Sequence, residues 1–398
     1  MKVLVFTTQF YQFGGAERLA VELAEELNKH GIHADILSMY TEDLPGVAEA
    51  KAALLQEGIP AVHFLCMKAH PSITRVVQAM WKLRRLIREH RYDIIETSMA
   101  SPAVIAAWAT LAMPTRLLAG LHAMYTRETW QGLNAWLWRL TMRLNRRVQF
   151  YAISNMVGKS LQQFARVSEN RVRTVYNAIN PQFFCVNRPS QVLAKELGLE
   201  NETRFALCVG RLVQAKGIET LLIGLGPILK ERNLHLVYIG SERPPENIFP
   251  DDESNLLQRM RTMIAENGWD THVHFLGQRS DVAELMAGAD ILVHPTWFEG
   301  FGLVLIEAMA TGLPVIATNV DAIPEIVEGT GAILVRPRDP EALRRGVESV
   351  LDLSPDVRQN IVQVGQKHAG NFLLARRVDR LTEMLYNLSM GYSLQRER

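Results

Sequence analysis

The stretch His294-Pro-Thr-Trp-Phe-Glu-Gly-Phe-Gly-Leu-Val-Leu-Ile-Glu307 joins an apolar run to a helical pattern through a glycine-containing loop. Sheets built from alternating strands and helices use such connections. The first backbone N–H groups of the helix are unpaired and favour an anion. Gly300 and Gly302 let a ligand approach the backbone, while Glu299 and Glu307 suit two hydroxyl-bearing parts of one extended ligand. An ordinary strand–loop–helix corner with solvated glutamates fits the same residues.

The same alternation runs along most of the chain. Short apolar runs predict strands near residues 2–8, 34–39, 61–65, 92–97, 116–120 and 149–153, with helical patterns between them. After a connector at 177–203, strands are predicted near 204–210, 235–240, 272–277, 291–294, 314–317 and 332–335, and helices follow from about 340. We expect an α/β protein with two Rossmann-like doubly wound parallel sheets, in domains 1–185 and 186–370. Ligands bind beyond the carboxyl ends of such strands, so two facing sheets would form a cleft.

Composition and charge narrow the class of protein. The chain has 398 residues, of which 48% are hydrophobic and 21% charged, an ordinary globular composition. Three scattered cysteines favour neither a disulfide framework nor a thiolate metal site. Residues 1–185 contain 21 Lys and Arg against 14 Asp and Glu, a net charge of +7, and the remainder carries −6. An anionic partner is therefore expected only for the first half.

The termini and apolar runs bear on localisation. The first residues turn polar at Thr7, too early for a signal peptide, and the apolar region 102–113 is too short to cross a bilayer of about 30 Å. We expect a cytoplasmic protein without a membrane-spanning helix.

Three further motifs follow predicted strands. Arg211 and Lys216, in Gly210-Arg-Leu-Val-Gln-Ala-Lys-Gly217, are cations suited to a diphosphate, although a basic loop capping the next helix is the plain alternative. Gly14 and Gly15 form a turn at a predicted helix start. His122 ends another predicted strand, where it could bind a sugar hydroxyl or serve a purely structural role.

Missing motifs exclude several chemistries. The Gly14-Gly15 turn is not the Gly-x-Gly-x-x-Gly fingerprint, and no acidic residue ends the second predicted strand, so a dehydrogenase is disfavoured. The sequence has no Gly-x-Ser-x-Gly elbow, no Walker loop and no Asp-x-Asp. No cluster of His, Cys and Asp has metal-ligand spacing, so Arg211, Lys216 and helix N-termini would have to neutralise a diphosphate leaving group.

Together these motifs resemble the family-4 retaining glycosyltransferases, which have the GT-B fold. Glu299 and Glu307 match the family's Glu-x7-Glu spacing, and Gly210-Arg211 with Lys216-Gly217 is similar to its donor-phosphate site. Phe275-Leu276-Gly277 resembles the strand end whose backbone reads the nucleobase, and the segment from 371 resembles the helix that returns to the first domain. The resemblance implies that helix 371–398 packs back onto domain 1–185.

The resemblance also implies roles. Glu299 and His122 would act at the donor sugar and Glu307 at the ribose. The diphosphate would contact Arg211, Lys216 and the loop of Gly14 and Gly15, with the remaining donor contacts from Leu276, Gly300, Phe301, Gly302 and Leu303. The implied enzyme is a retaining hexosyltransferase that uses no metal or other cofactor. A UDP-sugar is favoured as donor over a GDP-sugar, on family frequency alone.

The sequence departs from the family pattern in three places: Asn177-Ala-Ile-Asn180, Gly240-Ser-Glu242 and Asp321-Ala322. None of these removes a proposed catalytic group. Asp321, which stands where the family often has glycine, could alter donor preference.

The acceptor side is suggested by two helical patterns in the basic half. At 130–147, Trp130, Leu133, Leu137, Leu140 and Leu144 form one stripe, with Arg139, Arg143 and Arg146 opposite and Trp136 and Trp138 beside them; at 73–90, Lys82, Arg85 and Arg88 lie beside Trp81. Such helices can lie on a protein core with their arginines in water, or on an anionic membrane.

The sequence thus predicts transfer to a glycan or lipid-linked acceptor in cell-surface polysaccharide or lipopolysaccharide biosynthesis. Peripheral contact with the inner face of the plasma membrane is expected, and no nucleic-acid partner. A GT-B-like nucleotide-sugar epimerase or phosphorylase, and a non-catalytic nucleotide-sugar-binding protein, are the alternatives.

Overall fold

The computed structural model describes residues 1–10, 15–67, 73–126, 132–186, 192–241 and 255–391. It divides into two compact units. Unit 1 runs from Met1 to Asn177 and includes the C-terminal helix from Ala375, and unit 2 runs from Ala178 to Leu374. The boundary between the units, after Asn177, lies a few residues before residue 185, at which the sequence predicted the end of the first domain.

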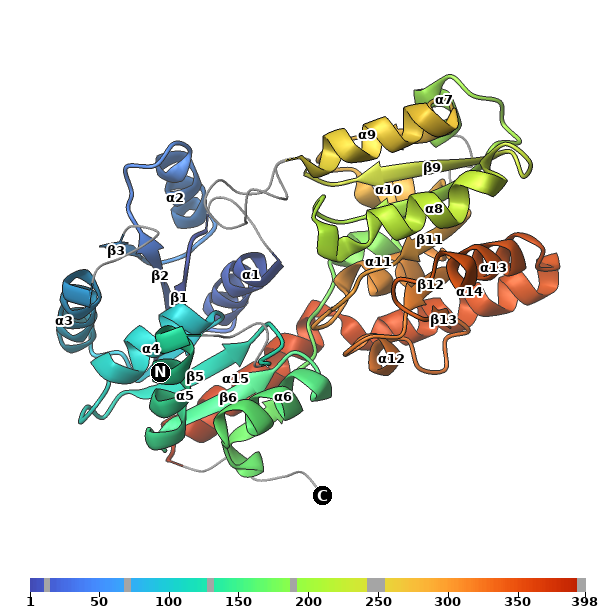
Figure 1. Ribbon diagram of the computed structural model, residues 1–398. Helices are drawn as coiled ribbons and strands as arrows, with labels where there is room; N and C mark the ends of the chain where they lie inside the picture. The colour runs from blue at the N-terminus through green and yellow to red at the C-terminus, as the bar shows by residue number, and fades with distance from the viewer. Residues whose placement is uncertain (11–14, 68–72, 127–131, 187–191, 242–254, 392–398) are drawn as a thin grey trace. The chain divides into compact units, whose positions relative to one another are not determined.

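Unit 1 is built on a seven-stranded sheet in the order β3-β2-β1-β4-β5-β6-β7 (Figure 1). Every pairing is parallel. From β1 the successive strands β2 and β3 are added toward one edge of the sheet, and from β4 the successive strands are added toward the other edge. The neighbouring strands β1 and β4 therefore mark the topological switch point. The strands are β1 Lys2–Thr7, β2 His33–Tyr40, β3 Val62–Met67, β4 Ile94–Thr97, β5 Arg116–Leu121, β6 Val148–Ala152 and β7 Val172–Thr174.

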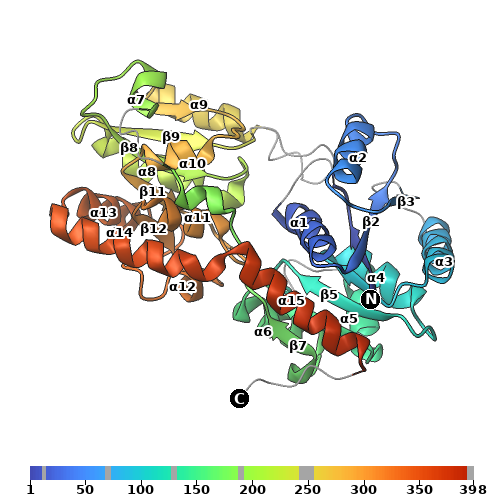
Figure 2. The ribbon, with the colours of Figure 1, turned by 180° about the vertical axis from the view of Figure 1, so that it is seen from behind.

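The helices of unit 1 form where apolar residues recur at helical spacing. In α1, Leu19, Leu23 and Leu27 lie on one buried face, as their spacing predicts. Ser154 caps α6 by accepting a hydrogen bond from the N–H of Val157 at 3.1 Å. The helices are α1 Gly15–Lys29, α2 Val47–Gln56, α3 Ile73–His90, α4 Ala100–Ala109, α5 Gly132–Leu144, α6 Asn155–Ala165 and, from Ala375 onward, most of α15 Leu374–Ser389. Figure 2 shows α15 from behind, on the same unit as β5 and β7.

Unit 2 is built on a six-stranded parallel sheet in the order β10-β9-β8-β11-β12-β13. Here the switch point lies between β8 and β11. The strands are β8 Arg204–Val209, β9 Leu234–Ile239, β10 Val273–Phe275, β11 Ile291–His294, β12 Val315–Thr318 and β13 Ile333–Val335. The described helices are α7 Val192–Leu197, α8 Ile218–Leu229, α9 Leu256–Asn267, α10 Val282–Ala287, α11 Leu303–Thr311, α12 Ile323–Ile326, α13 Pro340–Leu351 and α14 Pro355–Ala369.

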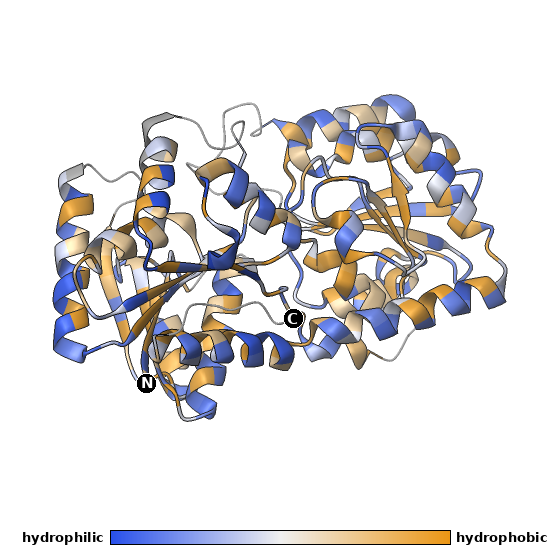
Figure 3. Cartoon of the chain, turned by 90° about the horizontal axis from the view of Figure 1, so that it is seen from below, coloured by the Kyte–Doolittle hydropathy of each residue, from blue (hydrophilic) through white to orange (hydrophobic). Residues whose placement is uncertain are grey.

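Both sheets are buried by their helices, which explains why the strands are continuous apolar runs rather than alternating ones. All six residues of β9 are buried, and the strands are coloured mainly as hydrophobic in Figure 3. The predicted fold class, two doubly wound parallel-sheet domains, is therefore confirmed.

Two local features differ from the sequence prediction. Strand β7 is only three residues long and carries Arg173 in its centre, so it has no apolar run to signal it. The expected connector contains helix α7, in which Leu193 and Ala194 are buried and which packs against α10. Tertiary packing, rather than length or propensity, stabilises so short a helix.

Among the described residues, no helix is both long and apolar enough to cross a membrane.

Candidate functional site

The loop between β11 and α11 is shaped by glycine. Gly302, the residue before α11, has φ of +90°, a left-handed conformation that residues with a Cβ rarely adopt. A Cβ atom there would lie 2.9 Å from Cδ1 of Leu305. Phe301 is buried and packs edge-to-face on Phe372, with ring centroids 5.9 Å apart. The ring of Phe301 thus belongs to the core, so that only its backbone could serve a ligand.

Glu299 and Lys216 form an ion pair at the switch point of unit 2. The Lys216 ammonium donates to Oε2 of Glu299 at 2.7 Å, and Nε2 of His294 lies 3.3 Å from the same oxygen. Burial opposes ionisation of Glu299, but the charge of Lys216 and the hydrogen bond to His294 outweigh it and hold the pKa of the carboxyl well below its usual value. The site therefore holds an ionised carboxylate beside a cation.

The loops after β8 and β11 are also joined through their backbones. The N–H of Trp297 and the hydroxyl of Thr296 both donate to the carbonyl of Ala215, at 2.8 and 3.1 Å. Gly217 has φ of +70°, and a Cβ there would lie 2.1 Å from the carbonyl oxygen of Pro295. Close approach of the two loops at Gly217 brings Lys216 within reach of Glu299.

Asp321 positions Glu299, which the sequence did not reveal. Oδ2 of Asp321 accepts a hydrogen bond from the N–H of Glu299 at 3.0 Å, and the N–H of Ala322 donates to the carbonyl of Glu299 at 3.3 Å. Asp321 has φ of +44°, a conformation in which the glycine common in the family is unstrained. The sequence signals this residue by its departure from the family's glycine, but that departure predicts a change in donor preference rather than a contact with Glu299.

The other predicted donor-binding residues of unit 2 lie along the carboxyl ends of its strands. Arg211 is exposed after β8, and its carbonyl accepts a hydrogen bond from the Tyr238 hydroxyl at 2.8 Å. Leu276 follows β10, and its N–H donates to the carbonyl of Tyr238 at 3.0 Å. Gly300 and Gly302 flank Phe301 in the loop, and Leu303 and Glu307 are partly buried in α11. The structure thus joins Lys216 directly to Glu299 and places the other residues at the same edge.

In unit 1, His122 follows β5 and rests on a buried polar network. Its Nε2 lies 3.4 Å from the Tyr151 hydroxyl, which donates to Oε1 of Glu96 at 2.6 Å. Burial, and then the charge of Arg377, lower the pKa of His122 to about 3, so the imidazole is neutral. Burial raises the pKa of Glu96 to about 7. Gly120 makes the network possible, because a Cβ there would lie 2.4 Å from the Tyr151 ring.

Arg377, from α15, adds a buried positive charge beside this network. Its side chain is buried, and its guanidinium carbon lies 5.8 Å from the centroid of the Tyr151 ring. Within the part of the chain that the structure describes, none of its three guanidinium nitrogens has a hydrogen-bond partner. Glu96, Tyr151 and Arg377 cannot be predicted as neighbours from the sequence, because no spacing along the chain connects them.

Gly14 lies outside the described residues. Gly15 is the first residue of α1, and Glu17 of the same turn accepts a hydrogen bond from the Thr8 hydroxyl at 2.9 Å.

The core alternative for the apolar stripe of α5 does not hold at its end. Leu144 is 68% exposed, whereas Trp138, predicted beside the arginines, is buried and stacks on Tyr125 with centroids 4.7 Å apart. The helix is turned so that the large Trp138 ring, with Ala135 and Met142, occupies the core. Trp130 and the side chains of Leu133 and Leu137 lie outside the description.

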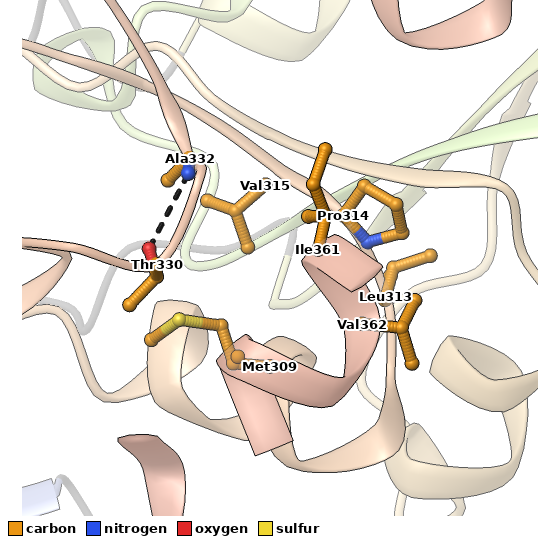
Figure 4. A pocket seen from close by; sticks show the side chains of 9 residues that line it. Met309, Leu313, Pro314, Val315, Thr330, Ala332, Ile361 and Val362 are labelled. Atoms are coloured by element: carbon orange, nitrogen blue, oxygen red, sulfur yellow. Dashed lines mark hydrogen bonds between the residues drawn. The ribbon is translucent and has the colours of Figure 1, made fainter. Parts of the chain in front are cut away.

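The described pocket shown in Figure 4 is separate from these polar loops. It is lined by residues of α11, β12 and α14 and is mainly apolar. Its one hydroxyl, that of Thr330, accepts a hydrogen bond from the N–H of Ala332 at 3.3 Å. Its lining has no ionisable side chain, so it is not a diphosphate site; it consists of Met309, Leu313, Pro314, Val315, Thr330, Ala332, Ile361, Val362 and Gly365.

Comparison with solved structures identifies the fold. HepE of Anabaena, crystallised with UDP, superposes with a TM-score of 0.81 over 97% of this chain and 100% of that one, at 22% identity. WaaG, described as a glycosyltransferase of lipopolysaccharide biosynthesis, superposes with a TM-score of 0.72 over 96% and 99%, at 19% identity. The two units therefore define a GT-B fold.

Family models identify the sequence. Residues 203–352 match the model for glycosyl transferases group 1, and residues 13–183 match that for glycosyltransferase family 4. The chain belongs to the family-4 glycosyltransferases.

Two relatives show how far the similarity extends. The lipopolysaccharide glucosyltransferase WaaG of Escherichia coli is 23% identical over 367 residues, 87% of this chain and 88% of the relative. An uncharacterized glycosyltransferase of Methanocaldococcus jannaschii is 29% identical over 209 residues, 51% of this chain and 50% of the relative. The chain thus matches only about half the length of the latter.

Proposed function

We propose that the protein is a retaining, metal-independent hexosyltransferase that uses a nucleotide-diphosphate sugar. The observation that carries the proposal is the ion pair between Lys216 and Glu299 at the β8–β11 switch point. Ligands of doubly wound sheets bind at this place, and the pair presents one cation and one ionised hydrogen-bond acceptor to them. A diphosphate needs the first and sugar hydroxyls need the second.

Each residue has a distinct role in this proposal. Lys216 and exposed Arg211 bind the diphosphate, so that Lys216 shares its charge between Glu299 and a phosphate oxygen. The Glu299 carboxylate accepts hydrogen bonds from hydroxyls of the sugar, and Glu307 binds the ribose. Fixed cations and backbone N–H groups stabilise the charge that develops on the leaving group, which is the work a metal performs in other transferases.

Retention follows from attack on the face that the leaving group departs from. The bond from the anomeric carbon to the phosphate oxygen breaks, the acceptor oxygen bonds to the same carbon, and the acceptor proton passes to the leaving phosphate. His122 is neutral, so its imidazole can form a hydrogen bond with a hydroxyl of the donor sugar without placing a positive charge beside the reacting carbon.

Names of relatives support the choice of substrates. HepE was crystallised with UDP and with UDP-glucose, and WaaG and the LpsB protein of Rhizobium meliloti are named as lipopolysaccharide transferases. A UDP-sugar donor, with a GDP-sugar second, and a glycan or lipid-linked acceptor of cell-surface polysaccharide biosynthesis are therefore proposed for this chain.

The test is release of nucleotide diphosphate with and without acceptor, in the presence of a chelator. A transferase releases UDP or GDP only with acceptor, and proton NMR shows the product with the donor's anomeric configuration. Glu299→Ala and Lys216→Ala should abolish turnover, whereas Lys230→Ala, which removes an exposed lysine at the end of α8, should not. Release without acceptor indicates an epimerase or hydrolytic side reaction, phosphate-dependent cleavage indicates a phosphorylase, and donor binding without release indicates a non-catalytic protein.

The proposal includes peripheral contact with anionic membranes through unit 1. On α3, Trp81 is 66% exposed, and Lys82, Arg85 and Arg88 lie exposed beside it. Helix α4 packs between α3 and α5 and exposes Trp108, while α5 exposes Trp136. Exposed indole rings among basic side chains are typical of surfaces that bind lipid headgroups.

Sedimentation with anionic liposomes at low salt tests this contact. The Lys82→Glu/Arg88→Glu variant should sediment less than the wild type, and Lys367→Glu, on exposed α14 of unit 2, should sediment equally. Wild type that stays in the supernatant would refute membrane contact without affecting the proposed reaction.

A further inference from the structure

Three imidazoles and one carboxylate converge at the amino edge of the unit 1 sheet. We name this group, His33, Asp35, His63 and His90, the histidine cluster. One ligand atom from each of Asp35, His63 and His90 lies within 4.8 Å of the others, and Nε2 of His33 lies 3.1 Å from Oδ2 of Asp35. The rings of His63 and His90 meet edge-to-face with centroids 5.0 Å apart.

Three secondary-structure elements supply these side chains. His33 and Asp35 are two residues apart on β2 and so project from the same face of the sheet. His63 is the second residue of β3, and His90 is the last residue of α3. All four therefore lie where the strands of unit 1 begin, whereas His122 follows the carboxyl end of β5.

Asp35 gives this cluster the character of a cation site. It is 1% exposed, and its Oδ2 accepts from the Tyr92 hydroxyl at 2.5 Å. Its Oδ1 is buried and has no hydrogen-bond partner among the residues that the structure describes. In the described part of the chain, its ion-pair partners are the imidazoles of His33 and His63, and neither Lys nor Arg pairs with it. A buried carboxylate that has only weakly basic partners gains from a bound cation.

We propose that the histidine cluster binds one Zn2+ ion. Zn2+ takes imidazole nitrogen and carboxylate oxygen in tetrahedral sites, and Asp35, His63 and His90 supply three such ligands, with His33 or water as the fourth. Because Mg2+ and Ca2+ prefer oxygen ligands, the imidazole-rich set selects against them. The ion would join β2, β3 and the end of α3 within unit 1, so its role is structural.

Unit 2 contains a second group of histidines that serves as an internal control. His235, His272 and His274 lie near the start of β9 and β10, and Nδ1 of His235 lies 2.9 Å from Nε2 of His274. The rings of His235 and His274 stack in parallel, so these nitrogens face each other rather than a common point. No carboxylate joins them to form a candidate metal site among the described residues.

Calorimetric titration of the chelator-treated full chain with ZnCl2 tests the proposal. We expect one Zn2+ per chain, a higher melting temperature, and at least about tenfold weaker binding in His63→Ala and in His90→Ala. His272→Ala should bind as the wild type does. Tyr92→Phe should also retain binding, because it frees Oδ2 of Asp35 from the Tyr92 hydroxyl while keeping the packing.

Co2+ provides a second readout, since the intensity of its visible bands reports tetrahedral coordination. The wild type should give intense bands that are lost in His63→Ala. Absence of Zn2+ binding to the wild type, binding that survives in both His63→Ala and His90→Ala, or binding that is lost in His272→Ala would each overturn the proposal. Turnover in chelator tests the proposed reaction separately.

Discussion

Replacing Glu96 with glutamine should make the protein more stable in alkaline solution. Burial raises the pKa of Glu96 from an ordinary value of 4.5 to about 7 in the folded chain. Folding therefore favours the protonated carboxyl, so this residue's contribution to stability is full below pH 4.5 and decreases as the pH rises to 7. Above that range the ionised carboxyl costs about 3 kcal/mol, from about 1.4 kcal/mol for each unit of pKa.

Glutamine removes this cost and keeps the acceptors. Its Oε1 can accept from the hydroxyls of Tyr151 and Ser98, which lie 2.6 and 3.1 Å from Oε1 of Glu96. At pH 8 we expect Glu96→Gln to raise the free energy of unfolding of unit 1 by up to about 3 kcal/mol, or the melting temperature by about 6–12 °C. At pH 4 the wild type and Glu96→Gln should have the same melting temperature.

Differential scanning calorimetry at both pH values is the assay. The contrary result is a variant that is less stable than the wild type at pH 8 and equal to it at pH 4. It would mean that Glu96 is ionised in the folded chain and forms a stabilising pair with buried Arg377, so that its removal leaves the guanidinium uncompensated.

Three further predictions concern the two sites. Gly217→Ala should destabilise unit 2 by about 2 kcal/mol or more in urea unfolding, because the added Cβ would meet the Pro295 carbonyl. The control Gly268→Ala, at φ of +68° and with no described atom within 4 Å of the added Cβ, should cost only about 1 kcal/mol. Equal losses of stability in the two variants would show that the contact between the loops is unimportant. Asp321→Ala should lower kcat by about tenfold through loss of the hydrogen bond to the Glu299 N–H, and an unchanged kcat would contradict the positioning role. The His122 ring should show no NMR titration between about pH 5 and 8 because burial lowers its pKa to about 3; a midpoint near 6.5 would show that the ring is solvated.

Sequence reasoning was most successful where a pattern repeats or a motif is local. The β–α alternation predicted both sheets, because strands buried on two faces must be apolar throughout. Lys216 and Glu299 were each recognised from a loop that follows a strand, and parallel topology brings such loops to one edge. Their direct pairing at 2.7 Å depends on the approach of Gly217 to Pro295, which no spacing reveals.

Contacts between segments far apart along the chain could not be predicted from the sequence. Glu96, Tyr151 and Arg377 come from β4, β6 and α15, and the histidine cluster joins residues from β2, β3 and α3. On α5, Trp138 is buried against Tyr125 and Leu144 is exposed, although the helical spacing puts Leu144 in the apolar stripe and Trp138 beside the arginines. Tertiary packing decides which face of such a helix is buried, because several rotations of the helix about its axis are compatible with its apolar periodicity.

Thermal shift of the wild type and of Lys216→Ala with UDP-glucose, in the presence of a chelator, measures whether the loops after β8 and β11 bind the donor diphosphate. We expect ligand at a hundred times its dissociation constant to stabilise the wild type by about 2.7 kcal/mol, and Lys216→Ala to lose most of this stabilisation. If no UDP- or GDP-sugar stabilises the wild type, or if Lys216→Ala responds as the wild type does, then the loops after β8 and β11 do not bind the donor diphosphate.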